Sequence, residues 1–111
     1  MDLNIYPKCK ELLRKDTMEM LQLFVASFPV GEDFNKDFIT DDLIDSAQKA
    51  MLENNPRHLF DFFDKNNLTV EITGKWKYYV EGEKSPTLYN SRTECEKAAF
   101  TQAFKELESR L

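Results

Sequence analysis

The stretch LTVEITGKWKYYVEG, residues 68–82, decides the fold because it predicts an antiparallel hairpin together with its register. Its first half alternates apolar and polar residues, the pattern of a strand with one buried face. A two-residue loop would place Ile72 opposite a lysine and mix apolar and charged side chains on one face. A loop of three or five residues instead pairs Ile72 with Tyr78 and Val70 with Val80. Because a one-residue slip exchanges the two faces, we predict the odd loop.

The same register sets where the aromatic side chains of the hairpin lie. It directs Trp76 and Tyr78 inward and leaves Tyr79 on the solvated face beside two lysines. Strand aromatics stack on bases in proteins that bind single-stranded nucleic acid, but one exposed ring favours core packing here. After the hairpin we expect a turn at residues 83–86 and a short third strand over residues 87–89.

A wide apolar stripe near the end of the chain predicts a long helix. Ser91 and Glu94 have the spacing of a capping box at its start. A stripe of this width is typical of a helix packed on a sheet, so a lid is favoured over an exposed partner-binding helix. The stripe consists of Phe100, Ala103, Phe104, Leu107 and Leu111, widened by Cys95 and Ala99.

The first two thirds of the chain carry three helical patterns. Pro7 suits a first helical turn, and the spacing leaves open whether residues 8–28 form one helix or two. Thr40 predicts the N-cap of the next helix, and Asn55–Pro56 ends it and begins a third. The expected inner faces are Leu13, Thr17, Met20, Leu21, Phe24 and Phe28, then Leu43, Ala47, Ala50 and Met51, then Leu59, Phe60 and Phe63.

These elements predict a single α+β domain over residues 1–111, with N-terminal helices, a small antiparallel sheet and a long C-terminal helix packed on the sheet. Phe62 lies off the expected inner face of the third helix. Either that helix is buried all round, or Phe62 belongs to an apolar contact surface.

The net charge of −5 is unevenly placed. Residues 68–111 hold seven basic and seven acidic side chains, whereas the first 67 residues hold eight basic and thirteen acidic ones. A protein that neutralises phosphates shows the opposite sign, so direct nucleic-acid binding is disfavoured. No apolar run approaches the ~20 residues of a membrane span, and the start lacks a secretory signal. We therefore expect a cytoplasmic protein that does not enter a membrane.

The segment GEDFNKDFITDDLID, residues 31–45, is the strongest candidate for a functional surface. Asp33 and Asp37 match the first and fifth positions of an EF-hand loop. However, Phe38 stands where that loop needs glycine, and Ile44 stands where it needs a closing glutamate. The sequence therefore predicts no calcium site.

Aromatic rings among carboxylates suit contact with a basic protein surface. A buried aromatic side chain supplies affinity, and the surrounding charge raises the association rate and selects the partner. The alternative is that both rings of this segment fold into the core and the acids are merely solvated. The predicted partner-binding residues are Glu32, Asp33, Phe34, Asp37, Phe38 and Phe62.

No motif in the sequence indicates an enzyme. His58 is the only histidine, and we expect it at the surface near Asp61 and Asp64 of its own helix. Cys9 and Cys95 lie in separate helical patterns with no histidine pattern and no metal-type spacing. We predict no catalytic residue, no cofactor and no metal.

Two resemblances bear on function. The order helix, strand, strand, strand, helix is similar to the layout of double-stranded-RNA-binding domains, a family that relies on a basic cluster at the start of its last helix. The matching stretch here, NSRTECEK, holds only Arg92 and Lys97, opposed by Glu94 and Glu96. Separately, residues 75–111 resemble the C-terminal hairpin and helix of small uncharacterised proteins from phages and mobile elements of gut bacteria. That resemblance implies a bacterial or phage intracellular protein without an assigned activity.

The leading hypothesis is a non-enzymatic protein-interaction or regulatory module. A nucleic-acid-associated domain with a degenerate RNA-binding-like layout is the first alternative, and a small hydrolase or ligand binder is the second. The sequence does not specify the oligomeric state.

The charge distribution predicts no appreciable binding to single-stranded or duplex DNA or RNA at physiological salt. Fluorescence anisotropy with labelled oligonucleotides tests this. Micromolar affinity that weakens steeply as salt rises would contradict the prediction and favour the RNA-binding-like alternative.

Overall fold

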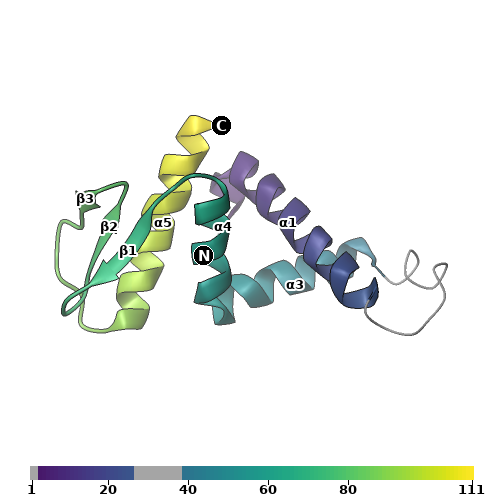
Figure 1. Cartoon of the computed structure of the whole chain (residues 1–111), viewed down its shortest axis with the longest axis horizontal. Helices are drawn as coiled ribbons and strands as arrows, with labels where there is room; N and C mark the ends of the chain where they lie inside the picture. The colour runs from purple at the N-terminus through teal and green to yellow at the C-terminus, as the bar shows by residue number, and fades with distance from the viewer. Residues whose placement is uncertain (1–2, 27–38) are drawn as a thin grey trace.

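The structure, a computed structural model, describes residues 3–26 and 39–111. It has the predicted α+β class, with a small antiparallel sheet at one end, α5 beside it, and α4 between α5 and the pair α1 and α3 (Figure 1). The elements are η1 (Leu3–Ile5), α1 (Pro7–Ala26), α3 (Asp41–Asn54), α4 (Pro56–Lys65), β1 (Val70–Thr73), β2 (Lys77–Val80), β3 (Glu83–Lys84) and α5 (Arg92–Arg110).

The register of the hairpin is the predicted one. Ile72 pairs with Tyr78 and Val70 pairs with Val80, across a three-residue loop over residues 74–76. Tyr78 and Val80 are buried, whereas Glu71 on the opposite face is exposed. The separation of apolar and charged side chains onto two faces therefore selected the odd loop.

The third strand was predicted at the wrong place. β3 is Glu83–Lys84, within the segment expected to be a turn, and residues 87–89 form no strand. The chain reverses immediately after Val80 because Glu81 and Gly82 both have positive φ, 53° and 80°, as a tight two-residue hairpin turn requires. Pro86 follows soon after, and a proline has no N–H with which to continue the ladder.

α5 covers the sheet, as its apolar stripe predicted. The Ser91 side chain accepts the backbone N–H of Glu94 and caps the helix. Leu111 departs from the prediction, since it follows the last helical turn and is 46% exposed. The buried residues of α5 are Cys95, Ala99, Phe100, Ala103, Phe104 and Leu107.

The N-terminal pattern forms one helix, α1, which begins at Pro7. Thr40 caps α3 by accepting the backbone N–H of Leu43, and Asn55 caps α4 in the same way. The buried face of α3 is rotated from the predicted one: Ile44, Gln48 and Met51 are buried, and Ala50 is exposed. The rotation follows from the crossing with α1, where Gln48 donates a hydrogen bond to the carbonyl of Lys10.

Phe62 is only 2% exposed, so the prediction that it contacts a partner is wrong. α4 lies between α5 and α1, and therefore buries a wider face than its spacing indicated (Figure 1). The ring centroid of Phe62 lies 6.2 Å from that of Phe104, and the Phe63 ring lies 4.9 Å from the same residue. The other alternative, a helix buried all round, is also wrong, because Arg57, Asp61, Asp64 and Lys65 are exposed.

The end of α5 also caps the start of α1. The two carboxylate oxygens of Glu108 accept the backbone N–H groups of Lys8 and Cys9 at 2.9 and 2.8 Å. Desolvation alone would raise the pKa of Glu108, but these two hydrogen bonds outweigh it and lower the pKa below 4.5. One side chain thus satisfies two of the unpaired N–H groups at a helix start.

Replacing Phe104 by alanine should lower the free energy of unfolding by roughly 3–5 kcal/mol, because it removes a fully buried ring from the aromatic cluster. Ser91→Ala should cost about 1 kcal/mol through the lost cap. The exposed neighbour Lys105 offers a control, and Lys105→Ala should stay within about 0.5 kcal/mol of wild type. A Phe104→Ala protein that melts within a degree or two of wild type would show that α5 is not a structural lid.

Replacing Glu108 by glutamine should lower the melting temperature at pH 7, because the amide has one acceptor oxygen and no charge. A carboxyl whose pKa is lower in the folded state stabilises the fold above its unfolded pKa and loses that contribution as pH falls through the folded value. The melting curves of wild type and Glu108→Gln should therefore converge below pH 4.5. Glu83→Gln, at an exposed position, is the control and should change little at any pH. A constant difference between pH 7 and about pH 3 would contradict this role.

Candidate functional site

Five of the six predicted partner-binding residues, Glu32, Asp33, Phe34, Asp37 and Phe38, lie outside the described residues. The prediction that they form a functional surface therefore stays a prediction. The elements on either side of that segment are described: the end of α1 and the start of α3 lie close to each other (Figure 1). The candidate site is built from these two ends.

The apolar face of α1 changes along the helix from buried to exposed. Cys9, Leu13 and Thr17, each one turn after the other, are fully buried. Farther along the helix Met20 is 39% and Leu23 75% exposed. Of the stripe that the sequence predicted as core, Leu13 and Thr17 are buried, Leu21 is half-buried, and Met20 and Phe24 are exposed; Phe28 lies outside the described residues.

The start of α3 supplies carboxylates that pair with the middle of α1. Asp41 and Asp45 both bind the guanidinium of Arg14 on α1, with 2.8 Å between Asp41 Oδ1 and Nη2. Asp42 is exposed in the first turn, where its charge complements the helix dipole. Two acids of the segment over residues 31–45 are thus held by an arginine 27 or more positions away.

We name the exposed end of α1, Met20 and Leu23, together with Asp42 of α3, the tip surface. It combines apolar side chains with negative charge, which was the combination predicted for the adjoining segment. Helical spacing alone could not separate Leu13 from Met20, because both belong to the same periodic pattern. Only the crossing of α3 over the first half of α1 distinguishes them.

His58 lies in a different environment from the one predicted. Its side chain is mostly buried, and its Nε2 lies 3.1 Å from a carboxylate oxygen of Asp16 on α1 without a hydrogen bond. Lys65 donates to the other Asp16 oxygen at 2.7 Å. The three side chains hold α4 against α1, and they bring no nucleophile with them.

The two cysteines are poor nucleophiles. Both are fully buried, and the Cys9 thiol donates a hydrogen bond to the carbonyl of Phe104. Burial and the neighbouring Glu108 carboxylate raise the pKa of Cys9 to about 12, and burial also raises that of Cys95. Since the thiolate is the reactive form, neither side chain is prepared for covalent chemistry. Within residues 3–26 and 39–111, no three histidine, cysteine or acidic side chains gather as a metal site would need.

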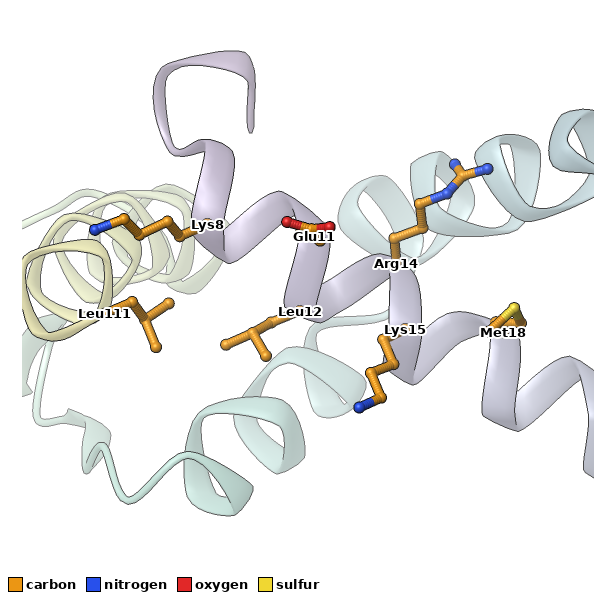
Figure 2. Close-up of a pocket in the computed structure, with 7 residues that line it drawn as sticks. All are labelled: Lys8, Glu11, Leu12, Arg14, Lys15, Met18 and Leu111. Atoms are coloured by element: carbon orange, nitrogen blue, oxygen red, sulfur yellow. The ribbon is translucent and has the colours of Figure 1, made fainter.

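A hollow of about 470 Å³ lies between the first half of α1 and the end of α5 (Figure 2). Leu12 and Leu111 approach each other there, Lys8 and Lys15 lie at its sides, and Arg14 points away toward α3 (Figure 2). The lining contains no histidine, cysteine, serine or threonine. Its full lining is Lys8, Glu11, Leu12, Arg14, Lys15, Met18 and Leu111.

The order α4, β1, β2, β3, α5 reproduces the helix and strand order of the double-stranded-RNA-binding resemblance. The basic side chains at the start of α5 do not form a cationic cluster. Arg92 forms an ion pair with Glu96, with 2.8 Å between Nε and Oε1, which leaves Lys97 as the other cation of that stretch. The order of elements alone carries no function.

Comparisons with known proteins identify no relative: no protein-family model, curated protein or solved structure matches the chain. None of the helices in the described ranges is long and apolar enough to cross a bilayer.

Proposed function

We propose that this protein is a non-enzymatic protein-interaction module that binds its partner through the tip surface and the segment that joins α1 to α3. The observation that carries the proposal is the exposure of Leu23, 75%, on the same helix whose earlier turns are fully buried. Isolated exposed leucines are ordinary, but here Met20 lies one turn before Leu23 and is itself 39% exposed.

The charge of the tip surface and the joining segment indicates the chemistry of the partner. Asp42 is exposed in the first turn of α3, and the joining segment brings Glu32, Asp33 and Asp37. Such a surface fits a partner that offers an apolar pocket within a basic rim, because apolar burial supplies affinity and charge complementarity guides encounter. The hypotheses of a cytoplasmic, bacterial or phage protein agree with this role and remain predictions.

Leu23→Ser should abolish or weaken partner binding at least tenfold and leave the melting temperature nearly unchanged, because the side chain is already in water. Leu88→Ser is the matched control, since Leu88 is 65% exposed on another part of the surface. Wild type, Leu23→Ser and Leu88→Ser serve as baits in extract from the cells that make the protein. Each partner that is captured is then purified and titrated against all three baits by calorimetry. A captured protein that binds wild type and Leu88→Ser but not Leu23→Ser supports the proposal. Equal affinity for all three baits overturns it.

The charge component is tested with the same purified partner. Replacing Glu32, Asp33 and Asp37 by neutral polar residues should slow association, most visibly at low salt, without changing stability. An association rate equal to wild type at all salt concentrations would remove the acidic segment from the binding surface.

A further inference from the structure

The sheet offers a second interaction surface, at the outer edge of β1. The strand order is β1-β2-β3, so β2 is paired on both sides and β1 on one side only. The backbone of Glu81 donates to the carbonyl of Thr69 at 2.8 Å, which makes these two residues a hydrogen-bonded pair. In an antiparallel ladder such pairs alternate, so Glu71 with Tyr79 is the next one.

The residues between these pairs point their backbone groups the other way. On β2, the backbone groups of Tyr78 point toward β3, and its carbonyl accepts the N–H of Ser85 at 2.9 Å. On β1, the same alternation directs the N–H and C=O groups of Val70 and Ile72 to the outer edge. No described residue outside the strands forms a backbone hydrogen bond with either of them.

The two edges of the sheet differ in how they are protected. β3 has two residues, both charged, and Pro86 follows it closely, which are ordinary ways to block strand addition. β1 has the sequence VEIT, without lysine or proline. Val70 and Ile72 also pack against the core while remaining partly exposed. β1 therefore presents both unpaired backbone groups and uncovered apolar surface.

We propose that the outer edge of β1 binds an extended segment of a partner protein, in which apolar and basic residues alternate, as an added strand of the sheet. The backbone groups of Val70 and Ile72 pair with the segment, and its apolar residues cover the exposed sides of these two side chains. Its basic residues lie on the solvated face beside Glu71, which is exposed and has no ion-pair partner among the described residues.

A second copy of this chain fits the edge poorly. Antiparallel pairing of two β1 strands that uses the edge groups of Val70 and Ile72 on both copies is centred on Glu71. It places the two Glu71 side chains directly opposite each other, at the close spacing of a non-hydrogen-bonded pair. Like charges at that position oppose pairing, whereas lysine or arginine in a partner strand favours it.

The proposal rests on the proposed function only in that both assign protein binding to this domain, and Leu23 and β1 can be tested separately.

The probe is the capped synthetic octapeptide (Val-Lys)4, titrated into the full-length protein and followed by amide NMR and hydrogen exchange. The amides of Val70 and Ile72 should exchange rapidly in the free protein and at least tenfold more slowly when the peptide is bound. (Pro-Lys)4 has the same charge, but its prolines have no backbone N–H to donate to the β1 edge. (Val-Glu)4 has the opposite charge. Neither should bind.

The matched variants are Glu71→Lys and Glu83→Lys, which make the same change at exposed positions on the two edges. Glu71→Lys should weaken binding of (Val-Lys)4 at least tenfold and permit binding of (Val-Glu)4, and Glu83→Lys should change affinity less than twofold. Leu23→Ser should bind (Val-Lys)4 as wild type does, so a failed tip surface leaves this result unaffected. The proposal is overturned if both lysine peptides bind equally, or if binding leaves the two amides unprotected. It is also overturned if the free protein forms a dimer as its concentration rises and the protection of these two amides increases with the dimer.

Discussion

The packing of Phe104 is the interaction on which the rest of the fold depends. Its ring, fully buried, lies within 6.2 Å of the rings of Tyr6, Phe62 and Phe63, measured between centroids. Its carbonyl accepts the thiol of Cys9. Residues from the start of the chain, α1 and α4 therefore meet at Phe104 of α5. The helix α5 also packs on β1 and β2. Since buried aromatic side chains contribute more apolar area than other residues, this cluster is where the helical half and the sheet half become one core.

The contacts near Phe104 also explain why the two ends of α1 behave differently. At its start, Glu108 satisfies two backbone donors and α5 lies alongside, so Cys9 and Leu13 are excluded from water. α3 packs on α1 between Lys10 and Thr17, where the Thr17 hydroxyl lies 3.8 Å from the sulfur of Met51. The apolar stripe continues past this crossing to Leu23. A helix that is fixed at one end and apolar at the other presents its free end in a defined orientation, which reduces the entropy lost when a partner binds there.

Local rules predicted the parts of the fold that depend on neighbours in sequence. The caps at Thr40 and Ser91 follow from short-range geometry. The hairpin register follows from whether its loop has an odd or an even number of residues. The position of β3 was missed because it depends on the positive φ of Glu81, a conformation that a glutamate does not signal. The burial of Phe62 and the rotated face of α3 depend on which helices lie across them. The pairing of Arg14 with Asp41 and Asp45 joins separate helices, so sequence spacing did not predict it.

The two proposed surfaces recognise different features of a protein. The tip surface offers side chains, so it selects a pocket by shape and a rim by charge. The β1 edge offers backbone groups two residues apart, so it selects an extended conformation first, and Glu71 then selects the residues on one face. The sheet and the end of α1 lie at opposite ends of the molecule (Figure 1). The two proposed surfaces are therefore separate (Figure 1), and the proposals allow two partners, or two segments of one partner, to bind without competition.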